Sequence, residues 1–278
     1  MSYVREELPL VQLLTNDVGV HHAGINTLSE AVRFKGSKYV QSTIGNCYKE
    51  VKNELKANRK VLFTGTPCQV AGLRNYLGQS YENLTTVDII CHGVPPIKLV
   101  REHLAHYCKT EDVTKVTFRD SEGYKLSAFK DKKKLYSESF PQDSYMYGFM
   151  YGLFYRPSCY ECRYANMQRV SDITIGDYWG LGKSMPVSYP CEKVSVVIPN
   201  TVKGSQLLSE CQDALFMEER DSEEAIAGNA QLRKPSKKHK YYNVFRKMYT
   251  LTGYKCAVRI CMIEFHIKYF IHRIITKR

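Results

Sequence analysis

Two strand–turn–helix units follow one another in the first half of the chain and constrain the fold more than any other feature. Residues 60–64 (KVLFT) form a short apolar run that ends in a GTPC turn at residues 65–68, and helix-like spacing of apolar residues follows. Residues 85–90 (TTVDII) repeat this order and lead into a second helical pattern that extends to Tyr107. Strands that alternate with helices in this way predict a parallel sheet.

Later segments add smaller elements to this frame. Residues 115–140 alternate in short segments around a basic turn, which is typical of an antiparallel hairpin insertion. Residues 173–175 and 194–198 read as further strands, and the second leads into a helix of about residues 203–211. The sequence therefore predicts an α/β fold: a mainly parallel sheet with flanking helices, an antiparallel hairpin insertion and a basic C-terminal helix.

The net charge of +12 is confined to the C-terminal tail. Residues 233–278 hold 13 Lys or Arg and one acid, Glu264, whereas the preceding residues balance 27 bases against 27 acids. Because a nucleic-acid groove normally involves the folded body, we expect no nucleic-acid partner. We expect one domain over residues 1–232, followed by a basic linker and an amphipathic helical tail over residues 233–278.

The helical tail carries an apolar stripe whose members are spaced by four and three residues. These are Cys256, Ile260, Ile263, Ile267, Phe270 and Ile274, and Arg259, His266 and Arg273 recur beside them every seven residues. Two interpretations stay open. The stripe packs on the body or on a second copy of the chain, or it lies on an anionic membrane surface.

Ten cysteines occur in a chain whose first thirty residues lack the apolar core of a signal peptide. We therefore expect a cytoplasmic protein, at most peripheral at the inner face of the membrane, whose cysteines are thiols or ligands rather than disulfides. No apolar run is long enough to span a bilayer. Neither a P-loop nor a G-x-G-x-x-G motif is present.

Four of the cysteines can meet at one edge of the predicted sheet. Cys68 and Cys91 each follow the end of a predicted parallel strand, where ligands collect in open sheets. The C-x-x-C pair of Cys159 and Cys162 would bring the number of thiolates to four, which suits an iron–sulfur cubane or a structural zinc. Unrelated thiols are the third interpretation, and spacing alone leaves all three open. The other six are expected to be small buried residues: Cys47, Cys108, Cys191, Cys211, Cys256 and Cys261.

Four ordered segments resemble the coenzyme F420 hydrogenase/dehydrogenase beta-subunit family. They are GSKYVQS at residues 36–42, GTPCQVAGL at 65–73, DIICHGVP at 88–95, and CYEC followed by SDITIGDYWG between 159 and 180. The resemblance covers about Val20 to Gln231 and is closest to a bacterial branch associated with polysaccharide biosynthesis.

This resemblance implies a flavoprotein that binds FAD and a [4Fe-4S] cluster and passes electrons between the flavin and an iron–sulfur partner or a deazaflavin-type coenzyme. The implied cluster ligands are Cys68, Cys91, Cys159 and Cys162. The implied flavin contacts are Ser37, Lys38, Tyr39, Gln41, Ser42, Gly65, Thr66, Pro67 and Gln69. Lys38 would place positive charge near a reduced flavin. Two interpretations stay open for Asp172 and Asp177: they are turn or cap residues, or they contact the flavin. The resemblance implies no catalytic residue.

Bacterial relatives begin with a two-cluster ferredoxin-like domain that this sequence lacks. We therefore expect an N-terminally shortened flavin domain that works with a ferredoxin-type protein or domain. The alternative is a non-catalytic interaction subunit, stabilised by a metal or cluster, of a polysaccharide-biosynthesis system.

Overall fold

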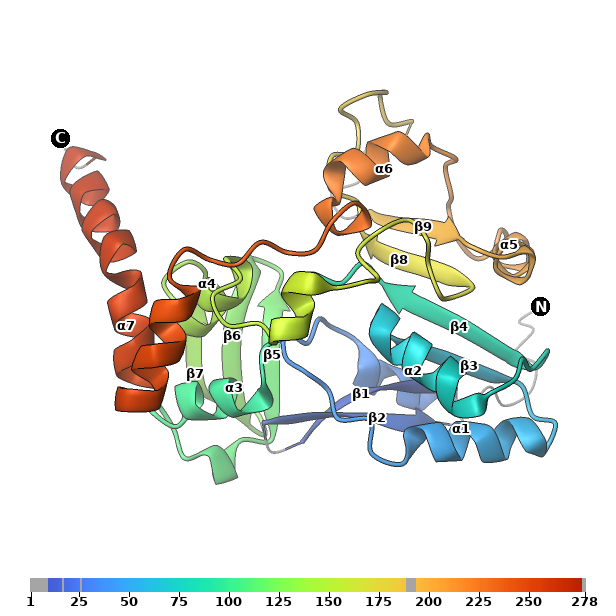
Figure 1. Cartoon of the computed structure of the whole chain (residues 1–278), viewed down its shortest axis with the longest axis horizontal. Coiled ribbons are helices and arrows are strands. Elements are labelled where there is room, and N and C mark those ends of the chain that lie inside the picture. Colours follow the sequence, from blue (N-terminus) through green and yellow to red (C-terminus); the bar gives the residue numbers. More distant parts are fainter. Residues whose placement is uncertain (1–9, 17, 26, 189–193, 277–278) are drawn as a thin grey trace.

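The computed structural model describes residues 10–16, 18–25, 27–188 and 194–276, which form two sheets with helices around them (Figure 1). Sheet A has six strands in the order β2-β1-β3-β4-β8-β9. Its strands are β1 (Leu10–Asn16), β2 (Gly19–Ile25), β3 (Val61–Gly65), β4 (Leu84–Ile89), β8 (Ile173–Asp177) and β9 (Ser195–Pro199). The pairs β1–β3, β3–β4 and β4–β8 are parallel, and β2 and β9 are antiparallel edge strands. The prediction of a mainly parallel sheet is confirmed.

Helix α1 (Cys47–Lys56) packs beside β2 and β3, and α2 (Pro67–Leu77) packs beside β3 and β4. The start of α2 follows from its sequence, because Pro67 occupies the first helical turn and Thr66 and Gln69 form a capping box. The helix ends at Gly78, whose φ of 72° is left-handed and suits glycine. One core cluster joins the two helices to the strands: Cys47, Val51, Leu55, Val61, Phe63, Val70, Leu73, Leu77 and Leu84.

Sheet B is the predicted insertion, and it is a three-stranded antiparallel sheet rather than a single hairpin. Its strands are β5 (Lys115–Asp120), β6 (Gly123–Lys130) and β7 (Lys133–Ser139), in sequence order. Helices α3 (Ile97–Leu104) and α4 (Ser144–Met150) lie beside it (Figure 1). Helix α3 ends before Tyr107, where the prediction extended it. Its last turn tightens into hydrogen bonds from His106 and Tyr107 to carbonyls three residues back, so helical spacing stops there.

The remaining elements are short. They are α5 (Val202–Glu210), α6 (Ser222–Gly228) and the 3-10 helices η1 (Leu28–Phe34), η2 (Thr110–Asp112), η3 (Pro157–Glu161) and η4 (Ala230–Leu232). Of these, only α5, α6 and η4 lie between β9 and the tail. The final helix, α7 (Tyr242–Thr276), is interrupted at Gly253, whose φ of 77° is not helical. Its C-terminal half extends past sheet B (Figure 1).

Helix α7 packs on the body through a different face from the stripe seen in the sequence. The buried residues are Tyr254, Ala257, Val258, Cys261 and Met262, which join the core cluster of sheet B, α3 and α4. The stripe itself is exposed, with Ile263 at 53% and Phe270 at 65%. Packing of the stripe on the body was therefore the wrong interpretation, because the helix has two apolar faces and the body covers the other one. Cys256 is exposed rather than buried for the same reason, and Cys191 lies outside the described residues.

Candidate functional site

The carboxyl ends of three parallel strands are aligned at one edge of sheet A. Gly65 of β3 is paired with Asp88 of β4, and Asp88 is paired with Thr174 of β8. The segments that follow these strands therefore begin side by side. This edge is where open parallel sheets bind their ligands.

The turn after β3 contacts the loop that precedes α1. The Gln69 side-chain amide donates to Ser42 Oγ at 2.8 Å, and its carbonyl oxygen accepts from the backbone N–H of Thr66 at 3.0 Å. A Cβ on Gly65 would lie 3.2 Å from the Gln69 side chain, so the backbone here is closely approached. The structure thus brings together Ser42, Thr66 and Gln69, which the resemblance predicted separately.

In the rest of the loop, Lys38 turns back to the end of η1, whereas Tyr39 packs against α4 and sheet B. The Lys38 ammonium donates to the backbone carbonyls of Phe34 and Lys35 at 2.6 and 3.0 Å, and burial lowers the pKa of Lys38 to about 8. The Tyr39 ring stacks on Phe149 at 4.4 Å between centroids. Lys38 is therefore partly buried, not a freely solvated surface lysine.

A polar group that sequence reasoning missed reaches this loop from sheet B. Arg119 of β5 forms an ion pair with Asp177 at 2.9 Å, and the side chains of Ser37 and Arg119 are near enough to the Tyr39 hydroxyl to lower its pKa in part. The pKa of Tyr39 is raised, chiefly by burial. No sequence signal marked Arg119, since β5 lies outside the four motifs. Asp177, the last residue of β8, thus faces the candidate site.

Cys91 interacts with all three of the other predicted ligands. The pKa of its thiol is raised to about 12, chiefly by burial, and the negative charges of three thiols contribute to this increase: Cys68, Cys159 and Cys162. The pKa of Cys159 is raised as well, first by burial and then by Cys68 and Cys162. Four thiols far apart in the sequence are therefore close enough to interact electrostatically.

Backbone amides of the turn after β4 act on two of these thiols. The N–H of Gly93 lowers the pKa of Cys91 and that of Val94 lowers the pKa of Cys159, so both amides favour the thiolate. The φ of Gly93 is 130°, and a Cβ there would lie 2.5 Å from the ring of Tyr155. Only glycine permits this packing. The turn also connects both predicted ligand loops, because the Arg156 N–H donates to the Val94 carbonyl at 3.1 Å.

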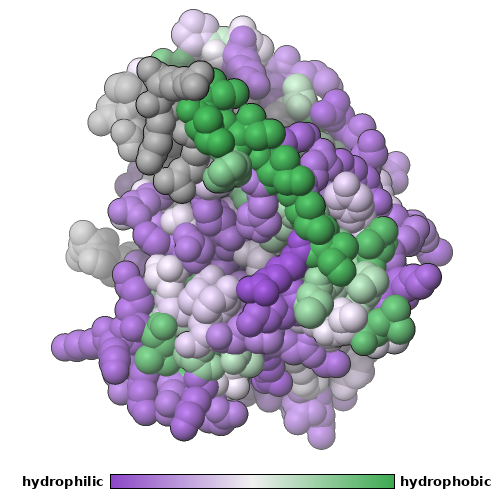
Figure 2. Space-filling view, turned by 90° about the vertical axis from the view of Figure 1, so that its left-hand side faces the viewer, coloured by the Kyte–Doolittle hydropathy of each residue, from purple (hydrophilic) through white to green (hydrophobic). Residues whose placement is uncertain are grey.

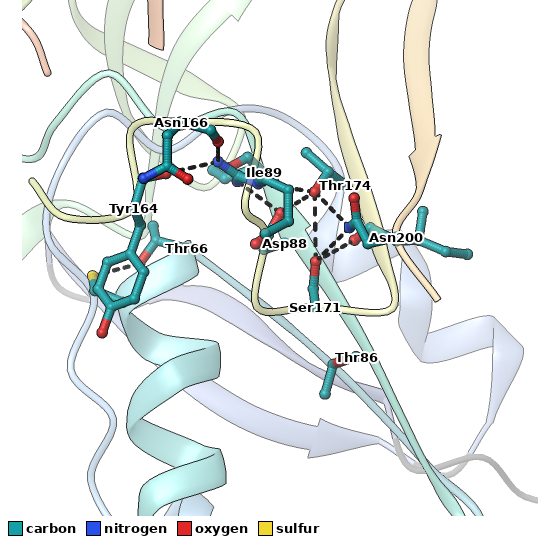
Figure 3. A network of polar contacts seen from close by, with 12 residues as sticks. Thr66, Thr86, Asp88, Ile89, Tyr164, Asn166, Ser171, Thr174 and Asn200 are labelled. Carbon is teal, nitrogen blue, oxygen red and sulfur yellow. Dashed lines mark hydrogen bonds and ion pairs between the residues drawn. The ribbon is translucent and has the colours of Figure 1, made fainter. Parts of the chain in front are cut away.

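Cys68 and Cys162 complete the group from α2 and from the loop after η3. Cys68 is exposed in the first turn of α2, and its sulfur lies 3.2 Å from Thr66 Oγ1 (Figure 3). Cys162 is partly buried directly after η3, which begins at Pro157. All four predicted ligands therefore follow or adjoin the carboxyl ends of the parallel strands.

A buried ion pair fixes the cysteine-bearing loop to β4 (Figure 3). Arg169 donates to Asp88 Oδ1 at 2.8 Å, and the side chains are 1% and 0% exposed. Arg169 also donates to the backbone carbonyls of Tyr164 and Ile89, at 2.9 and 3.1 Å. Thr174 donates to the same Asp88 oxygen at 2.6 Å. The arginine was missed because its partner is far away in the sequence, although Asp88 belongs to a quoted motif.

Asp172 has a structural role. It is buried and accepts hydrogen bonds from the backbone N–H and hydroxyl of Thr86, at 2.8 and 2.7 Å, and from Thr201 at 2.9 Å. These bonds join β4, β8 and the start of α5. Of the two interpretations left open for Asp172, the turn and cap role fits this geometry.

In the described part of the chain, no group of three or more His, Cys, Asp or Glu residues is arranged around a single metal ion. A cubane places different demands on its ligands, because each thiolate binds a different iron atom and the sulfurs surround a whole cluster. Two thiols, Cys91 and Cys159, whose pKa is raised in part by the charges of neighbouring cysteines, with amides that favour the thiolate, fit such a positively charged group.

Comparison of the sequence with models of known protein families identifies one family. The family model for the C terminus of the beta subunit of coenzyme F420 hydrogenase/dehydrogenase matches residues 58–225, which is more than half of the chain. A chain of the F420-reducing [NiFe] hydrogenase complex from Methanosarcina barkeri, solved as a xenon derivative, has a similar fold. Its TM-score is 0.50 at 14% identity, with 87% of this chain and 80% of that chain covered. No curated protein sequence matches.

The hydrogenase chain resembles this chain in fold, whereas the sequence relationship is shown by the family model. The matched segment contains all four cysteines and the strands that carry them. The chain therefore belongs to the coenzyme F420 hydrogenase/dehydrogenase beta-subunit family, and the part of that subunit that it matches is the C terminus.

Proposed function

We propose that the chain is a flavin- and [4Fe-4S]-dependent oxidoreductase subunit that transfers electrons between FAD and an iron–sulfur partner. Family membership supports a redox role. The observation that carries the finer proposal is that the thiols of Cys68, Cys159 and Cys162 lie near enough to the partly buried Cys91 for their charge to raise its pKa.

In this proposal the four cysteines hold the cluster. A thiolate is the ligand form, so the amides of Gly93 and Val94 help by favouring charge on Cys91 and Cys159. Arg169 holds the loop after Cys162 against the end of β4. The cations of the cluster would offset the repulsion among the thiolates.

FAD is assigned to the adjoining surface formed by residues 37–42 and 65–69. The flavin supplies two-electron chemistry and the cluster exchanges single electrons. Lys38 would place its ammonium beside the charge of a reduced flavin, and the Gly65 backbone allows close approach. Ser42 and Gln69 already form one hydrogen-bonded unit that can orient the cofactor.

The electron partner is proposed by chemical class. The Methanosarcina barkeri protein is part of a hydrogenase complex. For this chain we propose a ferredoxin-type protein or domain, which delivers the single electrons that a cluster accepts. The bacterial polysaccharide-associated branch and the deazaflavin coenzyme stay predictions of the motif resemblance.

Flavin binding is tested with the full chain reconstituted with FAD. Lys38→Met should weaken FAD binding at least about tenfold, because a hydrogen bond to a charged group contributes about 1.5–3 kcal/mol. Lys49→Met, on the exposed face of α1, is the matched control and should leave the affinity unchanged. Equal affinities for the two variants and the unmodified chain would remove Lys38 from the flavin site.

Electron transfer is tested by anaerobic titration of the doubly loaded chain with dithionite. Reduction should bleach both the flavin bands and the broad visible absorption of the cluster, and reoxidation through either group should restore both. A chain that binds FAD with no visible cluster absorption, and one zinc per chain, would instead be a zinc-stabilised flavoprotein and would contradict the proposal.

A further inference from the structure

The C-terminal half of α7 has two apolar faces, and only one of them is covered. Tyr254, Ala257, Val258, Cys261 and Met262 are buried against the body. The opposite face exposes a run of large apolar side chains at helical spacing: Ile260, Ile263, Ile267, Phe270, Ile271 and Ile274, each 38–65% exposed. We call this set the α7 stripe.

The α7 stripe is continuous along the projecting helix. Figure 2 shows it as a green band on the side of the molecule that carries α7, with hydrophilic surface on both sides. At its lower end a groove lined by Val244, Ile260, Ile263 and Ile267 extends the apolar surface onto the first half of the helix. A contiguous patch of this kind is unusual on a monomer and marks an interaction site.

The charges beside the α7 stripe are positive. Lys255 and Arg259 are exposed along one side of it, and the polar His266 lies in line with them. The one acid of the tail, Glu264, forms ion pairs with Lys240 and Lys268, and the bond from Lys240 is the main reason that its pKa is lowered to about 2. Glu264 therefore adds no free negative charge to this surface.

We propose that the α7 stripe docks on an anionic lipid bilayer, with the helix lying in the plane of the interface. An apolar face bordered by cations is the form that such helices take, since the apolar side chains enter the acyl boundary and the cations meet the headgroups. A second copy of the chain would bring two basic helices together, and their like charges oppose that pairing. Within the described residues, no helix is long and apolar enough to cross a membrane.

The test is co-sedimentation of the full chain with vesicles of phosphatidylcholine alone or mixed with phosphatidylglycerol. Binding should require phosphatidylglycerol and weaken at high salt. The double variant Ile263→Asp and Ile267→Asp should lower the partition coefficient at least about tenfold, because each buried isoleucine contributes and each new acid repels the lipid. Val202→Asp, which changes an equally apolar side chain that is 77% exposed on α5, should bind like the unmodified chain.

A second variant separates charge from apolar contact. Lys255→Glu with Arg259→Glu should lower binding to anionic vesicles and leave the folding transition unchanged, since both side chains are exposed. Equal binding by the Ile263/Ile267 double variant and the unmodified chain would overturn the proposal. So would a vesicle-independent dimer, measured by sedimentation equilibrium, that the same double variant dissociates.

Discussion

Asp88 and Asp143 are both fully buried carboxylates, yet their surroundings differ. Asp143 Oδ2 is 3.0 Å from His103 Nε2 and accepts from the Tyr136 hydroxyl at 2.6 Å, while Oδ1 accepts from the N–H of Met146. Asp88 uses Oδ1 alone, toward Arg169 and Thr174, and its Oδ2 has no partner among the described residues.

This difference separates a structural network from a site. The Asp143 network satisfies both oxygens and joins α3, β7 and the start of α4 in the core of sheet B. The Asp88 network leaves one acceptor unused, at the end of the strand that leads into Cys91. Buried polar groups are nearly always paired, so an incomplete network at a strand edge is typical of a functional region.

The largest effect is expected for Asp143→Ala. It removes the acceptor for His103 and Tyr136 and the N-cap of α4, so the free energy of unfolding should fall by about 3–5 kcal/mol. Urea denaturation followed by circular dichroism measures this. Asp143→Asn keeps an acceptor and should lose less. Iron and FAD content of the folded fraction should not change. If Asp143→Ala selectively removed iron, the two networks would not be separate.

The Arg169→Lys variant tests the Asp88 network, which is the one at the candidate site. Lysine keeps the charge but cannot bond Asp88 and two backbone carbonyls at once, so stability should fall by about 1–3 kcal/mol and reconstituted chains should retain less iron after desalting. Arg220→Lys is the matched control, since Arg220 is a buried partner of Glu224 and holds α6 rather than a cysteine loop. Equal iron retention in both variants would contradict a positioning role for Arg169.

His22 extends the comparison to a buried side chain whose two ring nitrogens have no well-formed hydrogen bond in the described structure. It stacks on Phe63 of β3, and burial lowers its pKa to about 4, an effect that the nearby backbones of Thr64 and Thr43 oppose only in part. Between pH 4 and 6.5 the unfolded chain therefore binds more protons than the folded chain, so the free energy of unfolding rises with pH in this window.

The expected loss between pH 7 and pH 5 is about 2 kcal/mol from this one group. His22→Phe should remove that part of the pH dependence and keep the stacking on Phe63. Urea midpoints measured at both pH values give the comparison. The same slope in His22→Phe as in the unmodified chain would assign the pH dependence to other groups.

The sequence predicted the parallel frame because its signals are local. The capping box of Thr66 and Gln69, Pro67 and the apolar run before them fix β3 and α2 without reference to distant residues. The hairpin of β1 and β2 was not predicted. The strand β1 joins sheet A by pairing with β3, which follows much later in the chain. Pairing between distant segments produces little local sequence pattern from which the strand could be predicted.

The candidate site shows the same division. The cysteines were predicted because strand ends and a C-x-x-C pair can be read directly. Arg169 and Arg119 were not, because their partners Asp88 and Asp177 are brought near by strand register and by the packing of two sheets. Periodicity found the apolar stripe of α7 but could not say which of its two apolar faces the body covers.

The central claim is that the four thiols hold one [4Fe-4S] cluster, and the iron and labile sulfide content of the anaerobically reconstituted full chain tests it most directly. We predict about four of each per chain, and a large loss in the Cys159→Ser, Cys162→Ser double variant. The control double variant Cys108→Ser, Cys211→Ser should keep full content, because these cysteines lie on other elements. Full content in the Cys159/Cys162 variant, or one zinc and no iron in the unmodified chain, would contradict the claim.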